Sequence, residues 1–279
     1  MKKLNLMING LPGNVAITIS KYALKDERFT IVPYSLTGPE IDDILFKIDG
    51  FEFTLIKPEI RDKQINDIKN RYDDIYTIDF THPSSVNSNA LFYINNDLPF
   101  VMGTTGGDRE KLKHDINEGA VSAVIAPNMV KQIVGFQAMM DYAANTFPDL
   151  FKGFTLEINE SHQQGKADTS GTAKAMVKYF NKLGLKFSGK NIKKERNPEV
   201  QRDVWKIPEK HLGGHGFHTY KLKSKDGTCE FKFEHNIYGR DIYVNGSLDA
   251  VLFLHKKLLT KTGNEKKYFT MIDVLKQGK

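Results

Sequence analysis

The sequence has a single cysteine, Cys229, among its 279 residues, so the chain cannot form an internal disulfide. Without a disulfide framework, a reducing compartment is the expected environment. Cys229 lies within an alternating polar and apolar run, residues 228–235, and this pattern favours a packing role over a nucleophilic one.

Long apolar segments are also lacking, since no stretch approaches the roughly 20 residues that cross a bilayer. Met1-Lys2-Lys3 leads directly into a short apolar run, so no signal peptide is expected. We therefore expect a cytoplasmic protein, or a protein of the plastid stroma if a transit peptide has been removed. No membrane partner is expected.

Concentrated basic charge is missing as well. The chain has 40 Lys and Arg against 34 Asp and Glu, a net charge of +6 that is scattered along the sequence. Scattered lysines indicate a solvated surface, or a mild attraction of anionic ligands into a cleft. No zinc-ligand spacing and no aromatic–basic stripe is visible, so neither a metal nor a nucleic-acid partner is expected.

The remaining composition is ordinary for a soluble globular protein, with 40% hydrophobic and 27% charged residues, and the length suits two domains. In the first half, strand-like and helix-like segments alternate. This predicts an α/β fold with a parallel, Rossmann-like sheet and right-handed crossovers. Strands are expected at 4–9, 29–34, 51–56, 75–80, 100–104 and 121–125, and helices at 14–24 and 108–118.

The pattern changes near Pro127, where longer alternating runs begin. They predict an α+β domain with an antiparallel or mixed sheet, one face of which is covered. Thr169 or Ser170 is a plausible N-cap for a helix at 170–183. The other expected segments are strands at 154–160, 215–222 and 229–236 and helices at 129–147 and 246–259. The chain thus divides into one domain of residues 1–127 and 241–279 and a second of residues 128–240.

A glycine loop, Gly10-Leu-Pro-Gly13-Asn-Val-Ala16, lies between the first expected strand and the first expected helix. Glycines allow a tight turn and a close approach of the backbone to a pyrophosphate, which the helix N-terminus then binds. Pro12 has no N–H to donate, but it stiffens the turn. The loop predicts a dinucleotide site, with an ordinary strand–helix turn as the alternative.

The cofactor preference depends on residues 34–37, where the second strand ends. NAD-selective sites hold the ribose hydroxyls there with an Asp or Glu, and this chain has neither. Ser35 and Thr37 are expected to donate hydrogen bonds to a 2′-phosphate instead. Because no Arg accompanies them, NADPH is favoured and NADH stays open.

Three further strands end in loops that suit a ligand at the carboxyl edge of a parallel sheet. These loops are residues 79–83, 103–106 and 126–129. Ordinary turn chemistry explains each loop taken alone. His82, in the first of them, is equally a capping or surface residue.

The most informative segment runs from Glu160 to Thr172 and contains His162, Lys166 and the helix start Ser170-Gly171-Thr172. A helix N-terminus with two hydroxyls forms a cradle for one carboxylate, and a lysine neutralises a second. A histidine with an ordinary pKa of about 6.5 donates a proton at neutral pH. A surface loop before a capped helix is the alternative.

On these residues the chain resembles the 4-hydroxy-tetrahydrodipicolinate reductases (dihydrodipicolinate reductases), and most of all their plant and cyanobacterial-like branch. The resemblance runs from residue 4 to residues 273–275, and its most specific part is the His–Lys–Ser-Gly-Thr segment. It is carried by Asp79-Phe-Thr-His-Pro83, Pro99-Phe-Val-Met-Gly-Thr-Thr-Gly-Gly-Asp-Arg109, Glu160-Ser-His-Gln with Lys166 and Asp168-Thr-Ser-Gly-Thr-Ala173, Gly214-His-Gly-Phe-His218, and Phe233-Glu-His-Asn with Gly239-Arg240.

The resemblance implies a cofactor domain built from both ends of the chain and a middle domain that binds substrate and forms a homo-oligomer, either a dimer or a tetramer. It implies reduction of 4-hydroxy-tetrahydrodipicolinate to tetrahydrodipicolinate, a step of lysine (diaminopimelate) biosynthesis, with hydride from NADPH or NADH. His162 is then the general acid and Lys166 an assisting cation or proton source. Arg240 faces either the site or an interface.

Together with the loops described above, the resemblance gives two sets of candidate contacts. Those for the substrate are Thr105, Gln163, Ser170, Gly171 and Thr172. Those for the cofactor are Gly10, Pro12, Gly13, Asn14, Val15, Ser35, Thr37, Phe80, Thr81, Gly103, Thr104, Thr105, Ala126, Pro127 and Asn128.

The chain departs from the bacterial members of that family at three positions. Gln163 stands where they have a second histidine, Thr169 where a proline precedes the Ser-Gly-Thr, and Asn14 where a basic residue is common. Three other functions remain open: an NAD(P)-dependent dehydrogenase of another small acid, a nucleotide-binding regulator without turnover, and a structural oligomer without a ligand. Substrate-dependent oxidation of NADPH separates the reductase from all three.

Overall fold

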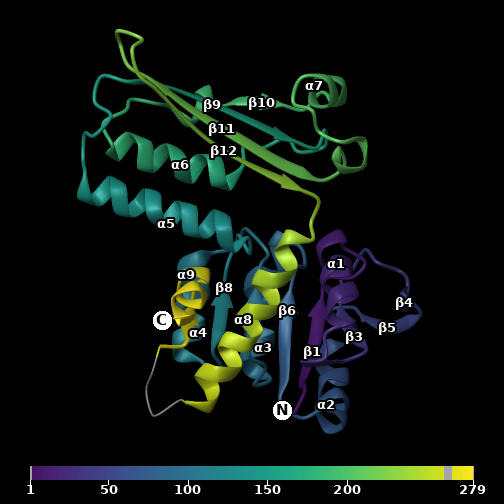
Figure 1. Ribbon diagram of the computed structural model, residues 1–279. Coiled ribbons are helices and arrows are strands. Elements are labelled where there is room, and N and C mark those ends of the chain that lie inside the picture. The colour runs from purple at the N-terminus through teal and green to yellow at the C-terminus, as the bar shows by residue number, and fades with distance from the viewer. Residues whose placement is uncertain (1, 261–265, 279) are drawn as a thin grey trace. The chain divides into compact units, whose positions relative to one another are not determined.

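The computed structural model describes residues 2–260 and 266–278, and the chain forms two compact units (Figure 1). Unit 1 consists of Met1–Val134 and Tyr243–Lys279, and unit 2 of Gly135–Ile242. Met1, residues 261–265 and Lys279, which the first predicted domain includes, lie outside the described residues. Among the described helices, none has the length and apolar character needed to span a bilayer.

Unit 1 is built on a six-stranded sheet of order β13-β8-β7-β6-β1-β2. Every neighbouring pair in it is parallel, so the predicted α/β class is confirmed. The strand β13 comes from the C-terminal part of the chain, and both ends of the chain therefore share one sheet. The strands are β1 (Leu4–Asn9), β2 (Phe29–Ile31), β6 (Ile75–Asp79), β7 (Phe100–Met102), β8 (Ala123–Ile125) and β13 (Tyr268–Phe269).

Helices cover both faces of this sheet, because successive strand residues point into two different cores. Leu6 and Ile8 of β1 belong to one core, and Met7 between them belongs to the other. The first core contains residues of α1 (Asn14–Ala23), α8 (Ile242–Leu259) and α9 (Met271–Leu275). The second contains residues of α2 (Arg61–Arg71), α3 (Val86–Asn95) and α4 (Arg109–Glu118).

A small second sheet in unit 1 has the order β3-β5-β4 and consists of β3 (Tyr34–Leu36), β4 (Leu45–Ile48) and β5 (Phe51–Ile56). The prediction of one strand over residues 29–34 is wrong. Pro33 has no N–H for a ladder hydrogen bond, and the chain leaves the large sheet there and enters the small one. The pattern also missed β4, although Asp49 and Gly50, with φ of 50° and 85°, form the two-residue turn typical of a hairpin.

Unit 2 is a mixed four-stranded sheet of order β10-β9-β11-β12, in which only the β9–β10 pair is parallel. The predicted mixed sheet is thus confirmed. One face packs on helices α5 and α6, whose residues share a core with Ile158, Tyr220 and Leu222 of the sheet. The elements are α5 (Lys131–Thr146), β9 (Thr155–His162), α6 (Gly171–Lys182), β10 (Lys193–Glu195), α7 (Pro198–Asp203), β11 (His215–Lys223) and β12 (Glu230–Tyr238).

The start of α6 places the predicted substrate segment. Ala173, Met176, Val177 and Phe180 are buried at helical spacing, so this face of α6 packs on the sheet. Ser170 is the N-cap, as expected, because its hydroxyl accepts hydrogen bonds from the amides of Thr172 and Ala173. Short 3-10 turns connect other elements: η1 (Pro83–Ser85), η2 (Gly189–Asn191), η3 (Glu209–His211) and η4 (Lys276–Gly278).

Candidate active site

The loop after β1 has the geometry that a dinucleotide site requires. Gly10 has a φ of +109°, and a Cβ atom at this position would lie 2.3 Å from the carbonyl oxygen of Phe80. The amide of Gly13 donates a 2.7 Å hydrogen bond to the carbonyl oxygen of Gly10, and a Cβ atom on Gly13 would lie 2.7 Å from that same oxygen. Only glycine fits both positions, and the resulting tight turn leads the chain directly into α1.

The N-terminus of α1 is open to an anion. No side chain caps it, and no acidic residue lies in its first turn. Asn14 is exposed, Pro12 and Val15 are half-buried, and Ala16 is fully buried in the core. The first-turn N–H groups and the helix dipole therefore suit a phosphate group.

Ser35 and Thr37 are buried, and both hydroxyls bind the glycine loop. Ser35 Oγ accepts a 3.2 Å hydrogen bond from the amide of Leu11, and Thr37 Oγ1 donates a 2.6 Å hydrogen bond to the carbonyl of Leu11. Glu40, which follows these residues in the chain, is exposed. Its carboxylate folds back to within 2.2 Å of where a Cβ atom of Gly38 would stand.

Asp79, the last residue of β6, joins the loops at the carboxyl edge of the large sheet. It is fully buried. One carboxylate oxygen accepts 2.8 Å hydrogen bonds from the hydroxyls of Thr81 and Thr104, and the other accepts from Tyr93 at 2.7 Å and Asn89 at 3.0 Å. Thr81 and Thr104 were predicted to contact the cofactor. In the structure their hydroxyls bind Asp79 and so join the two loops.

The remaining predicted cofactor residues lie on the same edge, where the carboxyl ends of parallel strands meet. A Cβ atom on Gly103 would lie 2.2 Å from the ring of Phe80, so the end of β7 packs directly on that ring. Ala126 is buried, and Asn128 Oδ1 accepts a 2.9 Å hydrogen bond from the amide of Val130. Exposed or half-buried candidates on these loops are Phe80, Thr81, Thr105, Pro127 and Asn128.

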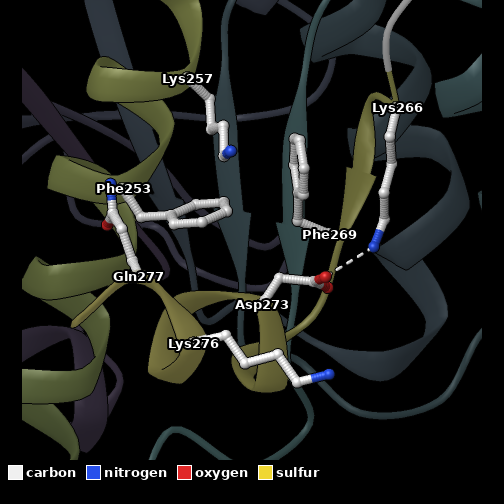
Figure 2. Close-up of a pocket in the computed structure, with 7 residues that line it drawn as sticks. All are labelled: Phe253, Lys257, Lys266, Phe269, Asp273, Lys276 and Gln277. Atoms are coloured by element: carbon white, nitrogen blue, oxygen red, sulfur yellow. Dashed lines mark hydrogen bonds and ion pairs between the residues drawn. The ribbon is translucent and has the colours of Figure 1, made fainter. Parts of the chain in front are cut away.

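A cavity of about 440 Å³ in unit 1 is formed by other residues (Figure 2). At its rim Lys266 donates a 2.7 Å hydrogen bond to Asp273. Its other lining residues are Phe253, Lys257, Phe269, Lys276 and Gln277. Because no predicted cofactor or substrate residue lines this cavity, we locate the cofactor site by the loops and not by the cavity.

In unit 2, His162 ends β9 with a half-buried ring and one nitrogen, Nε2, that has no hydrogen-bond partner among the described residues. Nδ1 lies 3.0 Å from the carbonyl oxygen of His215, which can only accept, so Nδ1 carries the proton. The Nε2 atom itself is buried. Burial lowers the pKa of His162 to about 4. The expectation of an ordinary pKa is therefore wrong for the protein alone, because the desolvated ring is neutral at pH 7.

The rings of His215 and His218 lie beside that of His162, and His235 packs against His218. Burial also lowers the pKa of His215, His218 and His235. His215 Nδ1 lies 3.1 Å from the carbonyl oxygen of His211 and must carry a proton, so the hydroxyl of Ser161 donates to His215 Nε2 at 2.9 Å. His162 thus lies in a poorly solvated setting, where a single added negative charge acts strongly.

Lys166 brings an ammonium group to the loop between β9 and α6. Its Nζ atom lies 2.6 Å from Asp168 Oδ1, and the side chain of Asp168 is 70% exposed. Such an exposed partner contributes little free energy and can be replaced by a substrate carboxylate. Gln163 is half-buried, and its carbonyl oxygen accepts a 3.0 Å hydrogen bond from the amide of Lys166.

The helix start at Ser170-Gly171-Thr172 divides into a structural and an open part. Ser170 is 6% exposed, its hydroxyl caps α6, and its amide donates a 3.1 Å hydrogen bond to Glu160 Oε2. Its hydroxyl therefore serves the helix. The amide of Gly171 and the hydroxyl of Thr172 make no hydrogen bond within the described part of the chain, so they are the open donors here.

Three groups of ligand type, from Glu160, His162 and His218, lie within 4.8 Å of one another. Both oxygens of Glu160 are engaged, one by Arg196 Nη2 at 2.5 Å and the other by the amide of Ser170 at 3.1 Å. A guanidinium group thus already neutralises this carboxylate, and we assign no metal to the cluster.

Sequence reasoning missed two residues beside the segment, Arg196 and Gln201. Gln201 is fully buried, and its Nε2 donates a 2.7 Å hydrogen bond to the carbonyl of His162. The one signal for it was a glutamine on a short helix that must bury one face. Arg240, whose place was left open, lies after β12 and donates a 3.3 Å hydrogen bond to the carbonyl of Gly213.

Comparison with known proteins matches almost the whole chain. The family model described as dihydrodipicolinate reductase, N-terminus, matches residues 4–129, and the one described as dihydrodipicolinate reductase, C-terminus, matches residues 133–275. A protein named 4-hydroxy-tetrahydrodipicolinate reductase 2, chloroplastic, from Arabidopsis thaliana is 42% identical over 275 residues, which are 99% of this chain and 78% of that protein. A probable 4-hydroxy-tetrahydrodipicolinate reductase 2, chloroplastic, from Oryza sativa subsp. japonica is 39% identical, over 98% of this chain and 83% of that protein.

Solved structures agree with the fold. The dipicolinate-bound dihydrodipicolinate reductase from Paenisporosarcina sp. TG-14 superimposes with a TM-score of 0.66 at 18% identity, and the match covers 98% of this chain and 99% of that one. At this identity the likeness concerns the fold alone.

Proposed function

The chain belongs to the dihydrodipicolinate reductase family, and we propose that it reduces 4-hydroxy-tetrahydrodipicolinate to tetrahydrodipicolinate in lysine (diaminopimelate) biosynthesis. Membership of the family entails a nicotinamide dinucleotide as the hydride donor. The assignment of the substrate is supported by the groups that the segment from His162 to Thr172 presents. These are an unpaired histidine nitrogen, an ammonium group and the open donors of a helix start.

The reaction must hold two carboxylates and deliver one proton. The substrate loses water to become a conjugated cyclic imine, which takes up a hydride at carbon and a proton. In sum, substrate, reduced cofactor and one proton give product, oxidised cofactor and water. The cofactor supplies the hydride when it is bound, and the protein supplies charge, orientation and the proton.

We assign the proton to His162 Nε2. The other ring nitrogen, Nδ1, already donates a hydrogen bond to the carbonyl of His215. Nε2 is therefore the nitrogen that can exchange a proton with a ligand. A neutral ring with a bare Nε2 accepts a hydrogen bond and cannot donate one. The substrate must therefore raise the pKa of His162 before the ring acts as a general acid, and a substrate carboxylate near Nε2 has that effect.

The two carboxylates then have separate partners. Lys166 exchanges Asp168 for one of them, while the amide of Gly171 and the hydroxyl of Thr172 donate to the other at the N-terminus of α6. Gln163 adds an uncharged hydrogen bond. Ser170 contributes through its position as the N-cap. Thr105, exposed on the loop after β7, stays a candidate for contact with the substrate.

We propose NADPH as the preferred hydride donor and NADH as a slower one. The Gly10–Gly13 loop and the α1 N-terminus bind the pyrophosphate, and no acidic residue stands at 35–37 to repel a 2′-phosphate. Glu40 is the carboxylate that opposes this preference, because it folds back over Gly38.

We propose a homo-oligomer, a dimer or a tetramer. The plant relatives are named chloroplastic, and we propose the plastid stroma or the cytoplasm as the place where this chain acts.

The test is oxidation of NADPH and NADH with freshly made 4-hydroxy-tetrahydrodipicolinate, followed through the nicotinamide absorbance. The native chain should turn over, and His162→Ala and Lys166→Ala should each lower kcat by about 10²–10⁴. His114→Ala, which alters an exposed histidine of α4, is the matched control and should change nothing. Tight NADPH binding without turnover by the native chain would contradict the proposal.

A further inference from the structure

Arg196, which follows β10, binds the loop that carries Lys166 from several sides. Its Nε atom donates a 2.8 Å hydrogen bond to the carbonyl of Lys166, and Nη2 donates to the carbonyl of Asp168 at 3.4 Å. Nη1 donates to the carbonyl of Glu195 at 2.8 Å. The side chain is only 17% exposed. With all three of its nitrogens engaged inside the protein, Arg196 is no ligand for a substrate carboxylate.

Glu160 forms an ion pair with the same guanidinium group. Its side chain is fully buried, Oε1 lies 2.5 Å from Arg196 Nη2, and Oε2 accepts a 3.1 Å hydrogen bond from the amide of Ser170. One ion pair therefore connects the end of β9, the middle of the loop and the N-cap of α6. Its two charges are desolvated, so removal of one partner alone would leave an uncompensated buried charge.

The strand end is tied to the same segment by Gln201. Its Nε2 atom donates to the carbonyl of His162 at 2.7 Å and to the carbonyl of Glu195 at 3.2 Å. Residues 195–201 thus fix the backbone at both His162 and Lys166. These are the two positions from which the proposed proton donor and the proposed carboxylate partner project.

We propose that Arg196 is a positioning residue for the substrate site. Its guanidinium group fixes the position of Lys166 relative to the start of α6, and Glu160 in turn fixes the position of the guanidinium group. This rests on the proposed function of the segment. The substrate must be held by Lys166 and by the α6 N-terminus at once, so a shift of the loop between them weakens both binding and reaction. The cofactor loops belong to unit 1 and Arg196 to unit 2, so we expect a change at Arg196 to act on the substrate and not on the cofactor.

The experiment compares Arg196→Lys with the native chain. Lysine keeps the positive charge beside Glu160. It has a single ammonium group in place of the planar guanidinium group, so the hydrogen bonds to the carbonyls of Lys166 and Asp168 are lost. We expect KM for the substrate to rise and kcat to fall, together lowering kcat/KM by about 10- to 100-fold, as for an error of about 1 Å in position. KM for NADPH should stay within about twofold. Arg202→Lys, on the exposed side of α7, is the matched control and should leave all three constants unchanged.

Hydrogen exchange gives a readout that needs no turnover. The amides of Lys166 and Ser170 are hydrogen-bonded in the native loop, and Arg196→Lys should speed their exchange while the amides of α6 beyond Ala173 stay protected. If Arg196→Lys does not fold, the neutral pair Glu160→Gln with Arg196→Gln replaces it and should show the same two changes, because no single buried charge remains.

The outcomes are distinct. Unchanged substrate constants with unchanged exchange, or an equal loss of NADPH and substrate binding, would overturn the positioning role. A native chain that never turns over would instead refute the proposed function, and the exchange rates would still decide whether Arg196 fixes the loop.

Discussion

A planar dicarboxylate such as dipicolinate should make His162 take up a proton when it binds. With a pKa of about 4, only about 0.1% of the rings are protonated at pH 7. For the imidazolium to predominate in the complex, the pKa must rise by about three units, which is a differential interaction of about 4 kcal/mol. One carboxylate about 4 Å from the ring supplies this energy at an effective dielectric constant of about 20.

The charges already around the ring leave room for this effect. Glu160 and Arg196 neutralise each other, Lys166 is paired with Asp168, and the histidines on β11 and β12 are neutral. Lys166 and Arg196 both lower the pKa of His162. In the proposed arrangement Lys166 pairs with one substrate carboxylate, whereas the carboxylate at the N-terminus of α6 has only the neutral donors of Gly171 and Thr172. The charge of this second carboxylate is therefore the one that raises the pKa of His162.

The proton uptake can be measured by calorimetry at pH 7 in buffers that differ in ionisation enthalpy. We expect about one proton per dipicolinate for the native chain and about none for His162→Gln. The pH profiles give a second assay. kcat/KM, which reports the free protein, should fall about tenfold per pH unit between about pH 5.5 and 8.5, because the protonated ring becomes rarer as the pH rises above 4. kcat should stay flat up to the higher pKa of the complex.

Binding of dipicolinate without proton uptake, together with a kcat/KM that does not change over this pH range, would refute the reasoning. His162 would then stay neutral throughout, and the proton would have to come from Lys166.

Four further changes have defined outcomes. Gly10→Ala should weaken NADPH binding in a fluorescence titration by about 1–3 kcal/mol, because its Cβ atom would meet the carbonyl of Phe80 at 2.3 Å; an unchanged affinity would contradict the loop assignment. Glu40→Gln should shift the ratio of kcat/KM for NADPH over NADH by about fivefold towards NADPH, as for about 1 kcal/mol from one exposed charge; no shift would remove Glu40 from the ribose site. Ser170→Ala should lower the free energy of unfolding by about 1 kcal/mol in urea, the usual effect of a lost N-cap. The free energy of unfolding should also fall as the pH drops from about 6.5 to about 4, by about 3 kcal/mol for each of His162 and His235, because the unfolded chain binds these protons first; urea curves at constant stability across that range would show that the folded rings titrate normally.

Local patterns predicted the tight turn at Gly10–Gly13 and the N-cap at Ser170, because both features depend on neighbouring residues. A glycine that must accept a positive φ or a close carbonyl, and a hydroxyl that must cap a helix, leave a signal within a few positions.

The parts that were missed depend on distant partners. Asp79 is bound by Thr104, 25 positions away, and Glu160 by Arg196, 36 positions away. No local pattern predicts such pairs, because the sheet order decides which residues meet. The low pKa of His162 also involves distant residues, because its ring packs beside His215 and His218, which follow it by more than 50 positions.

The shared sheet of unit 1 has a consequence for the order in which the protein is made. Ala123 of β8 pairs with Tyr268 of β13, and residues 135–242 lie between them in the chain. At a synthesis rate of about 5–20 residues per second, β13 is made roughly 7–30 s after β8, so one edge of β8 is unpaired for that time. All of unit 2 leaves the ribosome during that wait. A nascent chain is therefore expected to carry a complete unit 2 while the apolar edge of β8 is still uncovered, and this edge is the stretch that a chaperone would meet.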